Sequence, residues 1–183
     1  VVCDPERLNR SGSDFSEEDR KNIAETVGIG AIKYADLSHN RTSNYVFDMN
    51  KMVLMEGNTA AYIQYSYART RSILRKALAE GIAQGDLGAR KLALVEGPEL
   101  ALGLQLLRFE DMLSQSMSDY LPNMVTEYLF ETAKLFSSFY EQCPVLKADS
   151  PDVVLARLRL TELTGLTLKK GLELLGIRTV ERM

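Results

Sequence analysis

Three side chains within one short segment of this 183-residue chain could grip a nucleic acid: Tyr62, Tyr65 and Arg69. Their spacing would place them along one edge of a helix that is capped by Asn58 or Thr59, residue types that favour helix starts. Planar rings beside a guanidinium are the groups that stack on unpaired bases and hold a phosphate chain. The pattern therefore makes single-stranded RNA the first ligand to consider.

The same tyrosines also have a plainer interpretation. Tyrosines three residues apart on a helix more often pack half-buried against a core, with the hydroxyl group exposed to solvent. Ile63, Tyr67 and Leu74 fall on a separate edge of this helix, and we expect that edge to be buried. Spacing alone leaves both interpretations of Tyr62 and Tyr65 open.

Residues suited to metal binding or covalent catalysis are sparse. Cys3 and Cys143 lie far apart without a CxxC partner, so we expect both to be free thiols. His39 is the only histidine, and a turn or capping role is expected for it. Gly28 and Gly30 lack the strand, third glycine and lysine of a phosphate loop and are expected to be close-packing positions in a helix. We therefore predict no catalytic residue and no metal site.

Charge is unevenly distributed along the sequence. The whole chain carries a net charge of −3, which argues against sequence-blind nucleic-acid binding. Residues 57–97 nevertheless have six basic against three acidic residues, and residues 147–183 have seven against five. If these two parts lie side by side, they form a local basic face on an acidic body. The commoner alternative is a solvated charged helix face.

Helix boundaries can be predicted in the first half of the chain. Ser16, followed by acidic residues, predicts a helix over 17–37. Residues 45–47 are the only convincing extended segment, and a short helix is expected over 48–55. The tyrosine helix is then expected to end near Gly81.

Three later helices are each expected to begin at a proline: Pro98, Pro122 and Pro151. Apolar residues recur along them at helical spacing, and we expect these residues to form the core of an all-α bundle. They are Leu100, Leu104, Leu107 and Met112, then Met124, Tyr128, Leu135 and Phe139, then Val154, Leu158, Leu168, Leu172 and Leu175.

Six stretches carry a more specific pattern: GIGAIKYADLSHNR (28–41), NYVFD (44–48), GNTAAYIQY (57–65), LQLLRF (104–109), SFYEQCP (138–144) and LLGIRTVERM (174–183). Together they resemble the arginyl-tRNA synthetases, over nearly the whole chain from about residue 17. The resemblance implies the C-terminal part of such an enzyme. It places the end of the catalytic and connective region at 1–56 and an anticodon-binding helical bundle at 57–183, with the boundary at Gly57.

In this family the whole enzyme joins arginine to its tRNA through an arginyl-adenylate made from ATP with Mg²⁺. The HIGH-like and KMSKS-like signatures that hold ATP do not occur in this sequence, so the chain alone is expected to be inactive and to hold no cofactor. The implied partners are tRNA(Arg), and arginine and ATP through the missing catalytic part. The resemblance and the absence of a bilayer-spanning apolar run also imply a monomeric, cytoplasmic protein without a membrane contact.

Carried over residue by residue, the resemblance makes Tyr62, Tyr65 and Arg69 anticodon-loop contacts. Tyr140 and the terminal Met183 are implied as further contacts, and Gln64 is an additional candidate. The candidate anticodon contacts are therefore Tyr62, Gln64, Tyr65, Arg69, Tyr140 and Met183. Two alternatives remain at this stage. One is an RNA-binding paralogue without ligase activity, and the other is a helical module that docks another protein, since Tyr and Arg are also enriched at protein interfaces.

Overall fold

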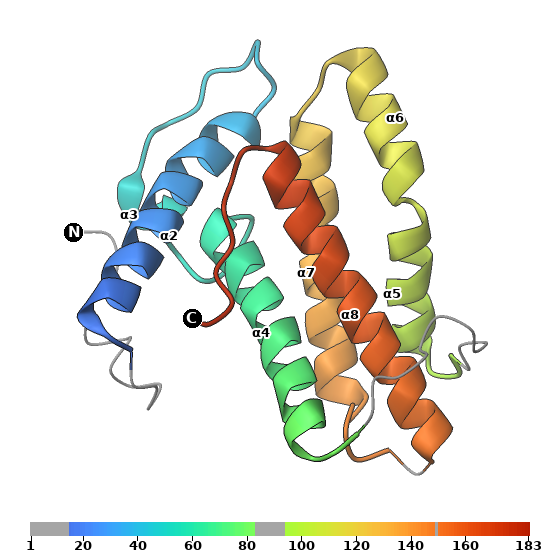
Figure 1. Cartoon of the computed structure of the whole chain (residues 1–183). Helices are drawn as coiled ribbons and strands as arrows, with labels where there is room; N and C mark the ends of the chain where they lie inside the picture. Colours follow the sequence, from blue (N-terminus) through green and yellow to red (C-terminus); the bar gives the residue numbers. More distant parts are fainter. Residues whose placement is uncertain (1–14, 83–93, 149) are drawn as a thin grey trace.

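The computed structural model describes residues 15–82, 94–148 and 150–183, and its regular structure is entirely helical within these ranges (Figure 1). This agrees with the predicted all-α class. The helices are α2 (Glu17–Leu37), α3 (Met49–Met52), α4 (Ala60–Ala79), α5 (Gly97–Leu107), α6 (Phe109–Asp119), α7 (Asn123–Gln142) and α8 (Pro151–Leu174). Cys3 lies outside the described residues, and Cys143 is a buried free thiol.

Helix α2 begins where the sequence predicts. The Ser16 hydroxyl accepts a hydrogen bond from the Asp19 amide at 3.1 Å, and the Asp19 carboxylate accepts one from the Ser16 amide in return. This capping box satisfies amides that have no partner inside the helix. Gly30 lies inside α2 at a close approach to α4, because a Cβ at this position would lie 2.9 Å from Gln64 Nε2. The predicted packing role of this glycine is confirmed.

The connection between α2 and α4 differs in detail from the prediction. Residues 45–47 form no strand, and the Tyr45 ring instead stacks on His39 with the ring centroids 4.6 Å apart. His39 Nδ1 lies 2.7 Å from the Ala35 carbonyl oxygen, which fits its expected role at a helix end. The short helix α3 is capped by Asp48 and ends at Met52, three residues before the predicted end.

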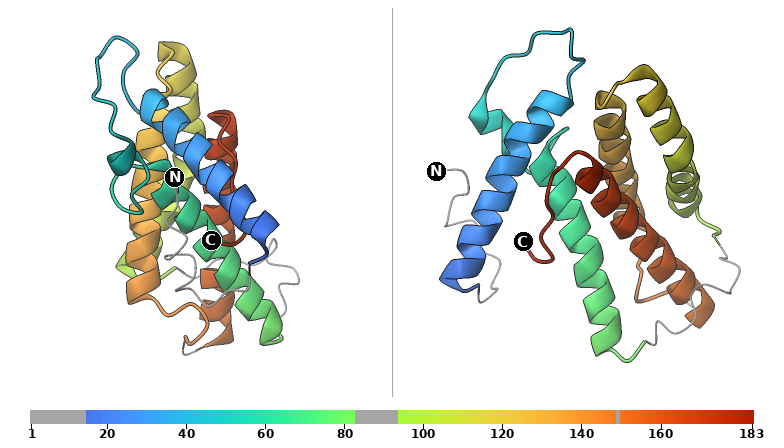
Figure 2. Two further views of the ribbon diagram at one scale, coloured as in Figure 1. Left: turned by 90° about the vertical axis from the view of Figure 1, so that its left-hand side faces the viewer. Right: turned by 45° about the horizontal axis from the view of Figure 1, so that its top comes forward.

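Helix α4 is the central element that positions the site. Thr59 caps it by accepting a hydrogen bond from the Tyr62 amide at 3.2 Å, as the sequence predicts. It lies between α2 on one side and α7 and α8 on the other, and α5 packs on the far side of α7 and α8 (Figures 1 and 2). The chain after α8 runs back between α2 and α4 (Figure 1).

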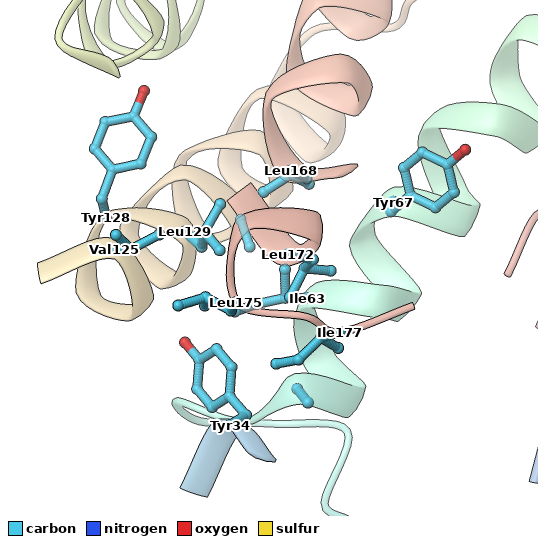
Figure 3. Close-up of a cluster of buried hydrophobic side chains, with 12 residues drawn as sticks. Tyr34, Ile63, Tyr67, Val125, Tyr128, Leu129, Leu168, Leu172, Leu175 and Ile177 are labelled. Carbon is cyan, nitrogen blue, oxygen red and sulfur yellow. The ribbon is translucent and has the colours of Figure 1, made fainter. Parts of the chain in front are cut away.

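The main core joins α4, α7 and α8. Ile63 and Tyr67 of α4 meet Leu129 of α7 and Leu168 and Leu172 of α8, and each of these side chains is buried (Figure 3). The predicted apolar edge of the tyrosine helix and the predicted core stripe of the last helix are both confirmed.

Helix α5 contradicts its predicted core face. Leu100, Leu104 and Leu107 are 46%, 58% and 78% exposed, whereas Glu99 and Gln105 face inward. The single helix predicted from Pro98 also ends at Leu107 and resumes as α6 at Phe109. The inward polar residues are satisfied by partners that the sequence pattern does not reveal.

Those partners belong to α7 and α8. The Glu99 carboxylate accepts a hydrogen bond from Arg157 Nε at 2.6 Å, and both side chains are buried. Gln105 lies with its Nε2 3.4 Å from the Tyr128 carbonyl oxygen, and the Tyr128 hydroxyl donates to the Gln105 carbonyl oxygen at 2.7 Å. Buried polar groups that are paired in this way can replace leucines on the inward face of a helix.

Candidate nucleic-acid interface

An open hollow of about 470 Å³ forms where four distant chain segments meet. The start of α2, one face of α4, the end of α7 and the last residues of the chain each contribute to its lining. The residues that line it are Phe15, Tyr65, Ala68, Arg69, Ser72, Arg75, Tyr140, Arg182 and Met183.

Arg69 lies between two tyrosine rings on one wall of this hollow. Its guanidinium carbon Cζ is 4.7 Å from the centre of the Tyr65 ring and 5.1 Å from the centre of the Tyr140 ring. Arg69 Nη2 also donates a hydrogen bond to the Tyr65 hydroxyl at 3.0 Å. Cation–π contacts hold such a group in a defined orientation. The wall therefore offers two aromatic faces and a fixed positive charge.

A second part of the lining comes from the residue before the cap of α2 and from the chain end. The Arg182 guanidinium carbon lies 5.1 Å from the centre of the Phe15 ring. Met183 and Phe15 both pack against a small apolar cluster that includes Ile23 and Val180. The terminal thioether is thereby held against the hollow as a polarizable surface.

Four of the six predicted site residues come together in this hollow: Tyr65, Arg69, Tyr140 and Met183. Tyr62 is not among the lining residues. Its ring meets Phe130 of α7 edge-on with the centroids 5.9 Å apart, and it is partly buried against the main core.

Gln64 is fully buried and does not reach the hollow. Its Nε2 donates a hydrogen bond to the Arg178 carbonyl oxygen at 2.8 Å, and lies 3.4 Å from the Thr26 carbonyl oxygen. Gln64 thus joins α2, α4 and the segment after α8, residues 175–183, which we call the tail. Gln64 is therefore a structural support, and not the predicted contact with a ligand.

Phe15 is the aromatic lining residue that the sequence analysis missed. It directly precedes Ser16, the cap of α2, where an apolar residue often packs against the first turns of a helix. That local signal indicates a packing role but gives no hint of the distant Arg182, so only the tertiary structure reveals its place in the hollow.

The predicted neighbourhood of two basic parts is observed, although part of its charge is already paired. The tail lies along α4, where Arg71 Nε pairs with the Glu181 carboxylate at 2.7 Å. Arg178 of the tail pairs with Glu25 of α2 at 3.0 Å. Arg69, Arg75 and Arg182 are the cationic residues that line the hollow itself.

Taken together, the hollow is a small aromatic and cationic surface on an all-helical bundle. Comparison with known families matches residues 63–183 to the DALR anticodon binding domain and residues 6–49 to the catalytic domain of class I (R) tRNA synthetases. The first match covers more than half of the chain. The chain therefore belongs to the DALR anticodon binding domain family.

Two similar proteins are arginine–tRNA ligases. The chain is 52% identical, over its whole length, to the arginine–tRNA ligase of Rhodopirellula baltica, and 47% identical, over 96% of its length, to that of Mannheimia succiniciproducens. It spans only 28% and 30% of these two relatives.

Solved structures give the same fold over nearly the whole chain. The arginyl-tRNA synthetase of Plasmodium falciparum superposes with a TM-score of 0.86 at 34% identity, over 98% of this chain and 31% of that protein. The Thermus thermophilus arginyl-tRNA synthetase gives 0.83 at 30% identity, over 96% of this chain and 29% of that protein. The predicted helical-bundle class is therefore confirmed by experimentally determined relatives.

Among the described residues, no helix combines the length and the apolar character that crossing a membrane requires. Within the same ranges, no group of three or more His, Cys, Asp or Glu side chains could hold a metal ion.

Proposed function

We propose that this chain is the anticodon-recognising part of an arginine–tRNA ligase. The observation that carries the proposal is the Tyr65–Arg69–Tyr140 stack, which lines an open hollow beside Met183. The family match and the arginine–tRNA ligase relatives support the same conclusion.

The chemistry of the hollow suits a few unpaired bases. Each base stacked on an aromatic ring contributes about 1–3 kcal/mol to binding, so two or three contacts supply substantial affinity. Arg69, Arg75 and Arg182 add charge for a short stretch of phosphate chain. An acidic chain with net charge −3 is compatible with this mode, because it needs few phosphate contacts.

The two family matches support a division of the protein between residues 49 and 63. One match ends at residue 49 and the other begins at residue 63, and Gly57 with its φ of +72° lies between them. We place the boundary at Gly57, with residues 1–56 completing the catalytic region and 57–183 forming the anticodon-binding bundle. Residues 1–14 of the first part lie outside the described ranges.

ATP, Mg²⁺ and arginine belong to the part of the full-length protein that this chain does not include. The HIGH-like and KMSKS-like signatures that hold ATP in this family do not occur in the sequence. We therefore expect that the chain alone does not charge tRNA. We further propose that the full-length ligase is cytoplasmic and monomeric, on the basis of its similarity to tRNA ligases.

Filter binding tests the proposal directly. The full-length protein should retain a transcript of tRNA(Arg) and bind a control transcript with an exchanged anticodon at least tenfold more weakly, the factor for one lost base contact. Equal retention of both transcripts would overturn anticodon recognition.

A helical protein-docking module remains the alternative, and one observation favours it. Leu100, Leu104 and Leu107 form an exposed apolar row along α5, and none of them lines the hollow. Replacing the three leucines by polar residues should leave tRNA binding unchanged if the hollow is the functional site. A loss of tRNA binding in that variant would shift the function to α5.

A further inference from the structure

The chain end is held in place at an unusual number of points. Helix α8 ends at Leu174, and Gly176 turns the chain with a φ of +67° so that it runs back between α2 and α4 (Figures 1 and 2). Lys33 Nζ of α2 donates to the Gly176 carbonyl oxygen at 2.6 Å. Ile177 and Val180 are buried on the way. Terminal residues are usually poorly ordered unless they are tied down, and here both neighbouring helices tie them.

Glu181 is the point at which α4 grips this tail. Its carboxylate accepts hydrogen bonds from the Tyr67 hydroxyl and from Arg71 Nε, the latter at 2.7 Å. Its backbone carbonyl oxygen accepts another from Arg75 Nη1 at 3.0 Å. Three side chains on successive turns of α4 therefore converge on one residue, two positions before the chain ends.

The charge of Glu181 is maintained by this environment. Burial raises the pKa of the carboxyl, but the hydrogen bonds from Tyr67 and Arg71 outweigh burial and hold the pKa below its ordinary value. The group is thus an anion at neutral pH. A carboxylate beside an RNA-binding hollow repels phosphates, so its presence there calls for a compensating role.

We propose that Glu181 is a positioning residue that sets Arg182 and Met183 in the hollow before tRNA arrives. This proposal rests on the proposed function of the hollow. Arg71 and Arg75 donate hydrogen bonds to Glu181. Their main role is therefore to hold the tail, and contact with the phosphate chain is secondary. Ordering the tail in the free protein removes an entropic cost that binding would otherwise carry.

A cycle of variants in the full-length ligase tests whether Glu181 acts through the last two residues. The variants are Glu181→Ala, deletion of Arg182–Met183, and both changes together. Each single change should raise the KM for tRNA about three- to tenfold, the loss expected when one or two ordered side chains are released, with kcat at saturating tRNA unchanged. In the deletion background, Glu181→Ala should have no further effect.

Two outcomes of this cycle overturn the proposal. If the two single effects multiply in the double variant, Glu181 acts independently of Arg182 and Met183. If Glu181→Ala leaves the KM for tRNA unchanged, the grip has no functional role. Should Glu181→Ala fail to fold, Tyr67→Phe removes one hydrogen bond to Glu181 and keeps the packed ring; it should raise the KM less, and only when Arg182–Met183 is present.

Two controls separate this proposal from the function on which it rests. Glu131→Ala removes a glutamate of an exposed ion pair on α7 that has no contact with the tail, and it should not change the KM for tRNA. Tyr65→Ala should raise it. If Tyr65→Ala weakens tRNA and Glu181→Ala does not, only the positioning role fails. If neither variant has an effect, the proposed function fails as well.

Discussion

Helix α4 carries the same local pattern twice, with opposite results. Tyr65 and Arg69 form one tyrosine–arginine pair four residues apart, and Tyr67 and Arg71 form another, displaced by two residues. In the first pair, Arg69 contacts both Tyr65 and Tyr140 at the edge of an open hollow. Both members of the second pair instead contact Glu181. One pair is available to a ligand, and the other holds the protein together.

The displacement explains the difference. Two residues rotate a side chain by about 200° around an α-helix, so the two pairs face nearly opposite sides of α4. Tyr67 is 3% exposed and belongs to the main core (Figure 3), and burial together with Glu181 raises the pKa of its hydroxyl to about 12. A tyrosine–arginine spacing therefore does not identify a binding site until the surrounding elements are known.

The largest expected effect comes from removing the buried ring. Tyr67→Ala leaves a cavity in the main core and frees the tail, and it should lower the free energy of unfolding by about 3–5 kcal/mol. Chemical unfolding of the purified chain, followed by circular dichroism, measures this change. The matched variant Tyr65→Ala should lower it by less than about 1 kcal/mol, because that side chain is only partly buried and lines the open hollow. Equal losses in the two variants would remove the distinction between the pairs.

The next effect is on binding. In the full-length protein, Tyr65→Ala should weaken tRNA(Arg) by about 1–3 kcal/mol, the contribution of one stacked base. Filter binding measures the dissociation constant, and an anticodon-exchanged transcript should show a much smaller change. A sharp fall in melting temperature with unchanged tRNA affinity would assign Tyr65 to packing.

Local features of the fold were predictable from the sequence, whereas contacts between distant residues were not. Helix starts were predictable because a cap is a local interaction: Ser16, Thr59 and Ser150 each bond to amides within three residues. The stripe on α8 was predictable because α8 packs against α4, α5 and α7 and buries its apolar residues there. The leucines of α5 were wrongly predicted to be core, since the buried Glu99–Arg157 pair joins residues 58 positions apart.

The site divides along the same line. Tyr65, Arg69, Tyr140 and Met183 came from the family resemblance, and periodicity alone left even Tyr65 undecided. Phe15 and Glu181 went unnoticed because their partners, Arg182 and the Tyr67–Arg71 pair, are more than 100 residues away in sequence. Gln64 was also proposed as a contact from the family resemblance, but it is fully buried and donates a 2.8 Å hydrogen bond to the Arg178 carbonyl oxygen.

A smaller effect distinguishes the two arginines. Arg69→Lys keeps the charge but loses the planar group that stacks between two rings, and it should weaken tRNA binding by about 0.5–1 kcal/mol. Arg71→Lys should change tRNA binding less, because a lysine can still pair with Glu181 as a point charge. Dissociation constants for both variants, measured side by side at one salt concentration, give the comparison. A larger loss for Arg71→Lys than for Arg69→Lys would contradict it.

The smallest expected effect is the dependence of the tail contact on pH. The pKa of Glu181 is lower in the folded chain than its ordinary value, so the carboxylate stabilises the fold above its unfolded pKa of about 4.3. This stabilisation is lost as the pH falls through the lower, folded pKa. The Glu181 side chain is 55% exposed, so solvent screening limits the contribution to about 1 kcal/mol or less.

The difference in melting temperature between the unmodified chain and the Glu181→Gln variant measures this contribution. It should stay constant from about pH 7 to pH 5 and shrink below about pH 4. Glu99 also has a lowered pKa, but it is present in both proteins and cancels in the difference. A difference that stays constant down to the lowest accessible pH would mean that the Glu181 charge does not hold the tail, and that the second tyrosine–arginine pair stabilises the fold through the packed Tyr67 ring alone.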